Sequence, residues 1–246
     1  MNLILLAPDE INQQSVVLTD RRAKHISTVL RNAAGDTVRV GIINGAIGQG
    51  VIKEIDRHRV VLEISLGETP APMPPTDLIL AVPRPIMLKR VLAQAASMGV
   101  ERIFLIKAKR VEKSFFSSAI IQDEAFLEPL LLGLEQAIAT RVPKISLHHR
   151  FLPFVDDELP AMLADCPTRL LAHPDTAKTI AASCALPLNG RAVLAIGPEG
   201  GWVDFEVEKF KSQGFVTFSM GPRILRVDTA VPALLAQLSL LREMTG

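Results

Sequence analysis

Apolar and polar residues alternate through the first 70 positions in a pattern that predicts a small β-rich unit. Three strand-like runs are rich in β-branched residues: Thr37–Ile43, Ala46–Glu54 and Arg59–Leu66. Asn44 and Gly45 separate the first two runs, and because both residues accept the positive φ of a tight turn, they predict a β-hairpin. A short helix is predicted over Asp20–Leu30, with Asp20 as its N-cap.

Beyond residue 76 strand-like runs alternate with helical ones, which is typical of a parallel α/β sheet. The predicted strands are Asp77–Val82, Arg102–Ile106, Lys144–Leu147, Arg169–Ala172, Ala192–Ile196 and Phe215–Ser219. The predicted helices are Ile86–Met98, Asp123–Ala139, Asp204–Gln213 and Thr229–Leu241. Gly99 follows the first helix where a left-handed residue ends a helix, and Pro129 is expected to kink the second or to shift its start.

A proline-rich stretch separates the two patterns. Four prolines fall within Thr69–Thr76, a composition that favours a stiff, extended connector. We therefore predict a β-domain over residues 1–70, a linker over 71–76 and an α/β domain over 77–246.

Composition and charge indicate a globular protein without a strong overall charge. The 246 residues are 48% hydrophobic with a net charge of +1, which indicates a globular chain whose attraction to nucleic acid must come from local clusters. The two cysteines and five histidines show no metal-ligand spacing, so no metal is expected. No run of 18 apolar residues occurs, and the apolar run at Met1–Ala7 is too short for a signal-peptide core, so a cytoplasmic location is expected.

Two glycine-containing loops follow predicted strands and are the best candidates for a ligand site. Gly197–Gly201 follows Ala192–Ile196, and Gly221-Pro222 follows Phe215–Ser219. Ligands of parallel α/β sheets collect at the carboxyl ends of strands, where glycine lets the backbone approach them closely. The alternative is a simple strand-to-helix turn with a solvated Glu199.

Two arginines follow the second loop, in GPRILRVDTA. Ile224 and Leu225 lie between Arg223 and Arg226 and are expected to anchor this loop in the core. Either the arginines pair with Asp228 or Glu199 and hold two loops together, or a guanidinium faces an anion or a carbonyl that becomes anionic during a reaction.

A basic cluster marks the N-terminal unit: Arg21, Arg22, Lys24, His25 and Arg31 lie within eleven residues that contain no acid. Such a run is either a solvated face or a contact for a phosphate-bearing partner. Glu135 and Gln136 share a predicted helix and either face the site or have no role in it.

Four segments together resemble the 16S rRNA uracil-N3 methyltransferases of the SPOUT superfamily: RRAKHISTVLRNAAGD, LEQAIATRVP, IGPEGGW and MGPRILRVDTAVPALL. The resemblance spans about 230 residues. It implies a PUA-like β-barrel domain for RNA, then an α/β domain with a mostly parallel sheet and a trefoil knot. It also implies S-adenosyl-L-methionine as cofactor, 16S rRNA of the small ribosomal subunit as substrate, and a homodimer.

The resemblance also implies site residues. For the cofactor these are Leu171, Ala172, His173, Ile196, Gly197, Pro198, Gly200, Gly201, Met220, Gly221, Ile224, Leu225 and Thr229. The basic cluster is assigned to RNA. Methylation of N3 requires loss of its proton, so Arg226 or Arg223 is expected to stabilise the uridine anion while Glu199 orients the loop or accepts the proton.

The sequence departs from the family pattern at several positions. Ala139 stands where an arginine is usual, Asp228 where glutamate is commoner, Val203 where a capping Ser or Thr is usual, and the helix before Gly99 lacks a Lys and a Glu. Two alternatives therefore stay open. The chain could methylate another RNA, such as tRNA, or it could be a non-catalytic RNA-binding relic of the fold.

Overall fold

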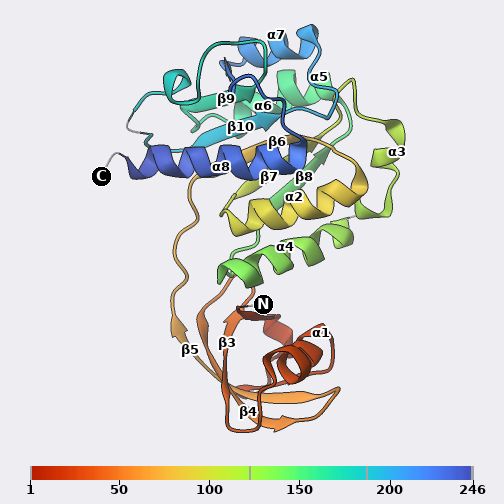
Figure 1. Ribbon diagram of the computed structural model, residues 1–246, viewed down its shortest axis with the longest axis vertical. Coiled ribbons are helices and arrows are strands. Elements are labelled where there is room, and N and C mark those ends of the chain that lie inside the picture. Colours follow the sequence, from red (N-terminus) through yellow and green to blue (C-terminus); the bar gives the residue numbers. More distant parts are fainter. Residues whose placement is uncertain (1, 122, 187, 245–246) are drawn as a thin grey trace. The chain divides into compact units, whose positions relative to one another are not determined.

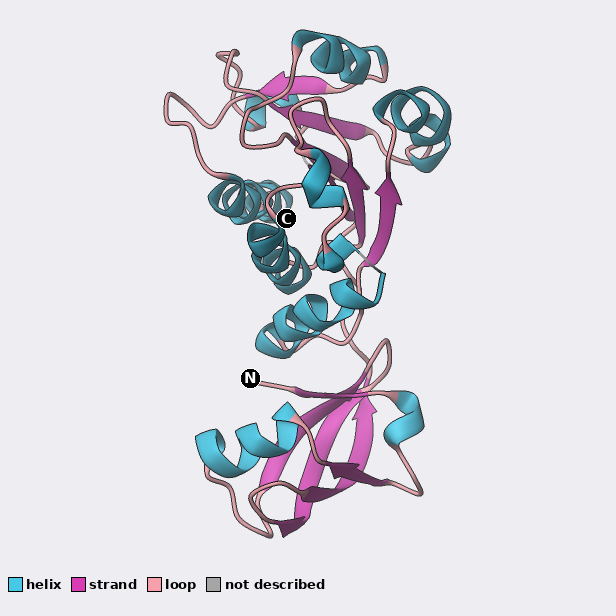
Figure 2. Ribbon diagram, turned by 90° about the vertical axis from the view of Figure 1, so that its right-hand side faces the viewer, coloured by secondary structure: helices cyan, strands magenta, loops and turns pink. Residues whose placement is uncertain are grey.

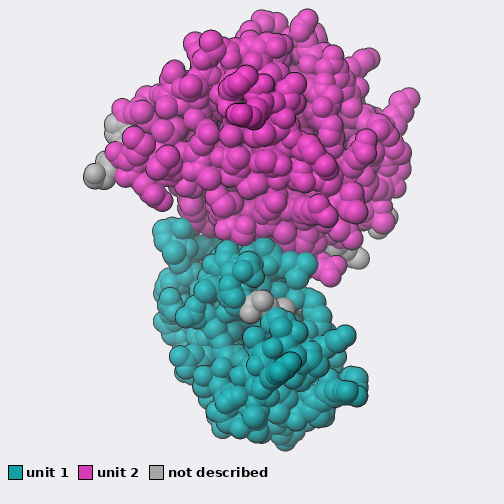
Figure 3. Space-filling view, viewed as in Figure 1, with its two compact units in different colours: residues 1–72, 131–142 teal, residues 73–130, 143–246 magenta. Residues whose placement is uncertain are grey.

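The computed structural model describes residues 2–121, 123–186 and 188–244. It divides into two compact units, which are described separately (Figure 3). Unit 1 contains residues 1–72 and 131–142, and unit 2 contains 73–130 and 143–246. Helix α4 (Asp123–Ala137) thus contributes residues to both units. The sequence prediction treated each domain as one continuous segment, whereas residues 131–142 pack with the N-terminal unit.

Unit 1 is built on a five-stranded sheet in the order β1-β3-β4-β5-β2 (Figure 1). Its strands are β1 (Ile4–Leu6), β2 (Ser15–Leu18), β3 (Thr37–Ile42), β4 (Ile47–Ile55) and β5 (Val60–Glu68). The pair β1–β3 is parallel, and the other neighbours are antiparallel. Apolar side chains from all five strands fill one core. The three predicted strands are confirmed to within a few residues, while β1 and β2 were not predicted.

The predicted hairpin is confirmed, with one difference in its turn. β3 and β4 pair antiparallel across it, but only Asn44 adopts positive φ (60°), whereas Gly45 does not. Asn44 also holds the returning chain, because its N–H donates to the Thr140 carbonyl at 2.7 Å and its Oδ1 accepts the Val142 N–H at 2.8 Å. A turn predicted from local conformation therefore also fixes residues nearly a hundred positions away.

The predicted helix over Asp20–Leu30 is only partly regular. Asp20 caps it as predicted, since Oδ1 accepts the Arg22 N–H at 2.8 Å. The α-helical part, α1 (Arg21–Lys24), then continues as a π-helical segment, η2 (His25–Leu30), which ends at Arg31 with φ of 56°. A short 3-10 segment, η1 (Pro8–Glu10), lies between β1 and β2.

Unit 2 is built on a six-stranded, wholly parallel sheet in the order β11-β9-β10-β6-β7-β8. Its strands are β6 (Thr76–Ala81), β7 (Arg102–Ile106), β8 (Lys144–His148), β9 (Thr168–Ala172), β10 (Ala192–Ile196) and β11 (Val216–Phe218). Every position of β6 is buried, as expected for a central strand covered on both faces. The six predicted strands and their parallel arrangement are confirmed.

Helices α2 (Pro85–Ser97) and α8 (Val227–Glu243) lie side by side on one face of this sheet (Figures 1 and 2). The left-handed residue that ends α2 is Gly99 as predicted, with φ of 76°. α4 continues through Pro129. The remaining segments are α3 (Lys113–Phe116), η3 (Ala119–Ile121), α5 (Phe151–Pro153), η4 (Phe154–Glu158), α6 (Leu159–Met162), η5 (Ala181–Ser183) and α7 (Asp204–Ser212).

The strand order decides where a ligand site can form. From β6 the chain runs outward through β7 and β8, then crosses to β9 and inserts β10 between β9 and β6. The carboxyl ends of β9, β10 and β11 are therefore neighbours, and ligands of open parallel sheets bind at such a reversal of strand order. The trefoil knot stays a prediction.

Candidate active site

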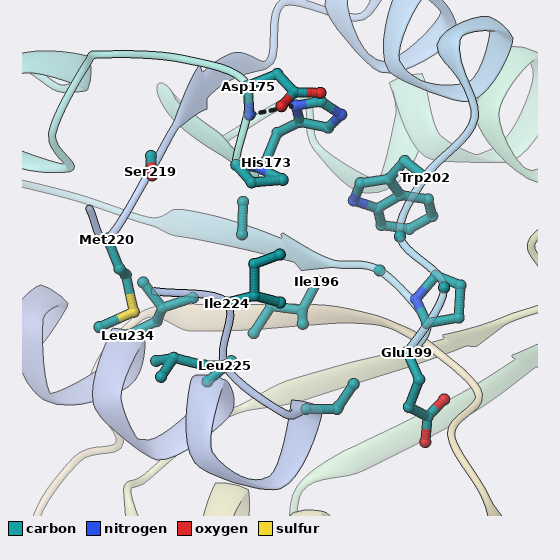
Figure 4. A pocket seen from close by; sticks show the side chains of 18 of the residues that line it. His173, Asp175, Ile196, Glu199, Trp202, Ser219, Met220, Ile224, Leu225 and Leu234 are labelled. Carbon is teal, nitrogen blue, oxygen red and sulfur yellow. Dashed lines mark hydrogen bonds between the residues drawn. The ribbon is translucent and has the colours of Figure 1, made fainter. Parts of the chain in front are cut away.

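A cavity of about 290 Å³ opens where the chain leaves β9, β10 and β11 (Figure 4). We call it the first cavity. Of the predicted cofactor residues, those that line it are Ala172, His173, Ile196, Gly197, Pro198, Gly200, Gly201, Met220, Gly221, Ile224 and Leu225. Glu199 and Arg223 line it as well. Leu171 is instead buried within β9, and Thr229 lies exposed in the first turn of α8, outside the lining.

The loop after β10 needs glycine at two positions. A Cβ on Gly197 would lie 3.1 Å from both Nε1 and Cε2 of the Trp202 indole, which is tighter than most real contacts. Gly201 has φ of 73°, a conformation that costs other residues about 1–2 kcal/mol. These glycines let the loop fold closely around the indole.

Trp202 lines the first cavity, although the sequence analysis did not select it. It is 5% exposed and packs edge-on against Phe210, with the ring centroids 5.2 Å apart. Its Nε1 is buried and has no hydrogen-bond partner among the described residues. Figure 4 draws this nitrogen on the side of the indole that faces the cavity. A buried N–H without a partner is costly, so this donor is suited to an acceptor on a ligand.

Glu206 joins the loop after β10 to the chain that follows β7. Its carboxylate is 2% exposed and accepts the Lys109 N–H at 2.6 Å and the Val203 N–H at 3.0 Å. The second bond gives the N–H of Val203, the N-cap residue of α7, a partner; valine itself has no side-chain acceptor for capping the helix. The neighbouring Arg110 donates to the Gly200 carbonyl and lines the cavity.

A second cavity of about 320 Å³ adjoins the first and shares Glu199 and Val227 with it. We call it the second cavity; it is lined by Arg84, Ile86, Met87, Glu199, Arg226, Val227 and Asp228. Two arginines and two carboxylates thus meet between the start of α2, the loop after β10 and the start of α8. The first cavity, by contrast, is walled mainly by apolar side chains and loop backbone.

Contacts within the second cavity bear on both interpretations of the arginines. Arg226 is 76% exposed, and its Nε lies 3.6 Å from Asp228 Oδ1, a long ion pair at the start of α8. Glu199 instead accepts the Arg84 N–H at 3.4 Å. The expectation that Ile224 anchors the loop in the core is wrong, because Ile224 is 87% exposed and Val227 is the buried residue. Arg226 lines the second cavity, and its Nη2 donates to Met87 Sδ at 3.7 Å.

The basic cluster of unit 1 is partly used inside that unit. Arg22 is buried, and its N–H groups are taken up by Glu10, Asp20 and the Leu5 carbonyl. The hydrogen bond from Arg22 lowers the pKa of Glu10 below its usual value. Arg21 forms a bidentate pair with Glu135 at 2.8 and 3.0 Å, which gives that glutamate a role within unit 1.

Four of the predicted RNA contacts remain accessible, since the Arg21 side chain is still 37% exposed in its pair with Glu135. Lys24 and Arg31 are exposed, and His25 is half-buried between them in the chain. Among the described residues, no group of three His, Cys, Asp or Glu side chains could hold a metal ion. Nor does any helix in the described ranges have the length and apolarity to cross a membrane.

Comparison with known proteins assigns the chain to a family. Residues 69–239 match the model of the RNA methyltransferase domain, and residues 18–65 match that of the RNA methyltransferase PUA domain. Ribosomal RNA small subunit methyltransferase E of Treponema pallidum is 31% identical over 237 residues, which cover 95% of this chain and 88% of the relative. The chain belongs to the ribosomal RNA small subunit methyltransferase E family.

Further relatives and solved structures are similar over nearly the whole chain. The relative from Synechocystis is 27% identical over 98% of this chain and 78% of its own length. The solved structure of the Neisseria gonorrhoeae methyltransferase E, bound to S-adenosylmethionine, superposes with a TM-score of 0.76 at 22% identity and covers 98% of both chains. A Legionella pneumophila protein solved with the same cofactor gives 0.78 at 23% identity over 97% of both chains. These two structures support the two-part fold of an RNA methyltransferase.

Proposed function

We propose that this protein transfers a methyl group from S-adenosylmethionine to N3 of a uridine in 16S rRNA of the small ribosomal subunit. The observation that carries the proposal is the first cavity, because the loops that the family signature predicts converge on it from three neighbouring strands. Family membership makes the chain an RNA methyltransferase. The names of the relatives support ribosomal RNA of the small subunit as the substrate.

The residues of the first cavity fit S-adenosylmethionine. Ile196, Leu225 and Leu234 give it apolar walls suited to a flat aromatic base, and the partnerless Trp202 N–H supplies a neutral donor beside them. The backbone of the Gly197–Gly201 loop and the polar side chains of Ser219 and Asp175 also line the cavity. They can form hydrogen bonds with the polar groups of the cofactor. When bound, the cofactor supplies a methyl group on a sulfonium, which leaves as a neutral thioether once the methyl carbon accepts an electron pair.

The chain's own residues then have to handle the charge of the uridine. Loss of the N3 proton spreads negative charge onto O2 and O4, so we propose that Arg226, with Arg223 as the second candidate, faces one of these oxygens. Arg226 is supported by its place in the second cavity beside Glu199. We propose that Glu199 orients the loop after β10, because its carboxylate accepts the Arg84 N–H at the start of α2.

For the remaining partners we propose the following roles. Lys24, Arg31 and His25 contact RNA, whereas Arg21 and Arg22 stabilise unit 1 through their carboxylate pairs. The PUA match of residues 18–65 supports RNA binding by this unit. A homodimer is supported by exposed apolar side chains at both cavities, and light scattering of the purified protein tests it. Action on ribosomal RNA makes the cytoplasm the expected location.

Isothermal titration with S-adenosylmethionine tests the cofactor site. We expect micromolar affinity, about −8 kcal/mol. Gly200→Val should abolish binding, because a Cβ there would lie 3.1 Å from Arg110 Cδ and the larger side chain fills the loop. Gly67→Val is the matched control, since its Cβ meets nothing within 4 Å. Absence of binding to the wild-type protein would favour an RNA-binding relic of the fold.

Methylation of small-subunit RNA from a deletion strain tests the substrate. We expect the purified protein to add one methyl group to a uridine of 16S rRNA, mapped by mass spectrometry. Methylation found only in another RNA, such as tRNA, would refute the substrate while leaving the cofactor site intact.

A further inference from the structure

We infer that the second cavity is the site of the uracil base and that Asp228 is the group that takes the N3 proton. This inference rests on the proposed function and goes beyond it, because the family signature pointed to Glu199 as the carboxylate. Three observations carry it: the unpartnered oxygen of the Asp228 carboxylate, the pattern of donors and acceptors around it, and the two lining residues that the cavities share.

The Asp228 carboxylate is mostly buried, and one of its oxygens has no hydrogen-bond partner among the described residues. Its side chain is only 19% exposed, and Oδ1 is buried without a hydrogen-bond partner among the described residues. The nearest cation is Arg226, whose Nε lies 3.6 Å away, beyond hydrogen-bond distance. A buried carboxylate oxygen without a partner is unfavourable unless a donor arrives, and the N3–H of an imide is such a donor.

The other carboxylates near the two cavities are less suited to this role. Glu199 is exposed, and one of its oxygens already accepts the Arg84 N–H. Asp175 lines only the first cavity, beside His173. Glu206 is buried and occupied by two backbone N–H groups. Asp228 is thus the carboxylate in the second cavity that combines burial with an unused acceptor.

The lining of the second cavity matches the imide edge of uracil. That edge presents O2, N3–H and O4, which is acceptor, donor, acceptor. Arg84 and Arg226 supply donors, and Asp228 supplies the acceptor for the middle position. Met87 and Ile86 add apolar contact for the ring. Cytosine would turn the lone pair of its N3 toward the carboxylate, so the same lining disfavours it.

Because the two cavities adjoin, N3 can lose its proton in one and receive the methyl group from the other. Because both cavities are lined by Glu199 and Val227, a base in the second can present N3 to a cofactor in the first. In the proton transfer the N3–H bond breaks, its electron pair stays on N3, and the proton binds a carboxylate oxygen of Asp228. The resulting carboxylic acid returns the proton to water after the base leaves.

The test compares Asp228→Asn and Asp228→Glu with the wild-type protein in single-turnover methylation at saturating S-adenosylmethionine. We expect Asp228→Asn to lower the rate by about 10²–10⁴-fold, the usual contribution of a positioned acid or base. Asp228→Glu should restore most of the rate. The deficit of Asp228→Asn should shrink as pH rises toward the ionisation of free uridine, because hydroxide then removes the proton.

Two controls separate this role from a structural one. Asp204→Asn removes an exposed carboxylate from the first turn of α7, and it should leave the rate unchanged. Cofactor binding is followed by the fluorescence of Trp202, the only tryptophan, and it should be unaffected by Asp228→Asn. Thermal melting of each variant checks its fold.

The outcomes distinguish this inference from the proposed function. Wild-type protein that binds the cofactor but methylates no uridine would overturn the proposed function. An active wild type with Asp228→Asn within threefold of its rate, or with a deficit that is constant across pH, would overturn the role of Asp228 alone. If Glu199→Gln, and not Asp228→Asn, lowered the methylation rate in a pH-dependent way, Glu199 would be the group that takes the proton.

Discussion

Replacement of Asp77 by alanine should destabilise unit 2 more than the loss of a surface carboxylate would. Asp77 is fully buried at the start of β6. Its Oδ1 accepts from Arg102 Nε and from Arg191 at 2.9 Å each, and its Oδ2 accepts from Arg102 at 2.5 Å. The hydrogen bond that Arg102 donates to Asp77 also raises the pKa of Arg102. One buried carboxylate therefore pairs with two partly buried arginines.

The size of the stability loss follows from the carboxylate partners that each arginine retains without Asp77. Without Asp77, Arg191 retains Glu101 at 2.9 Å and Asp165 at 3.3 Å, whereas Arg102 loses both bonds of its bidentate pair while its side chain stays only 23% exposed. Breaking a buried pair from one side costs about 3–5 kcal/mol. Asp165 is 68% exposed, so Asp165→Ala should cost less than about 1 kcal/mol.

Urea unfolding followed by the fluorescence of Trp202 measures both variants, because that tryptophan lies in the same unit as Asp77. The network lies at the amino ends of the strands, away from the two cavities, so cofactor affinity of the folded Asp77→Ala protein should equal that of the wild type. A loss below about 1 kcal/mol, or equal losses for the two variants, would refute the reasoning that burial sets the cost.

Three further predictions concern other parts of the chain. Trp202→Phe keeps a ring against Phe210 but removes the partnerless N–H, so S-adenosylmethionine should bind about 0.5–1.5 kcal/mol more weakly by calorimetry; unchanged affinity would contradict a ligand contact. Gln13→Asn with Gln14→Gly should stabilise unit 1 by about 1–2 kcal/mol in scanning calorimetry, because both residues have positive φ in a two-residue turn. Burial lowers the pKa of His148 from 6.5, so the folded state binds fewer protons and unfolding free energy should fall as pH drops below about 6.5. His148→Gln should flatten that dependence in urea unfolding, and an unchanged slope would exclude His148 as its cause.

Local sequence features predicted much of the fold. The alternation of strands and helices gave the parallel sheet of unit 2, because buried strands and amphipathic helices differ in period. Asn44, Gly99 and Asp20 marked a hairpin turn, a helix end and a helix start, since each requirement lies in the conformation or side chain of one residue. The short strands β1 and β2 were missed, although β11, which is equally short, was predicted.

The candidate site was predicted unevenly. The glycine loops were found because residues that allow close backbone approach are recognisable one by one, and most of them line the first cavity. The signal for Trp202 was its position directly after Gly201, but only the fold shows that its N–H lacks a partner. Arg22 looked like an RNA contact because sequence records its charge and not the carboxylates around it.

The sequence by itself determined most of the elements, the loops that needed glycine and the resemblance to the family, because these depend on neighbours in the chain. The tertiary structure alone decided that residues 131–142 join unit 1, that Ile224 is exposed, and that Arg226 and Asp228 meet Arg84 and Glu199 around one cavity. Those facts depend on contacts between segments far apart in the chain, where strand order and burial, rather than local conformation, set which charges meet and which stay unpaired.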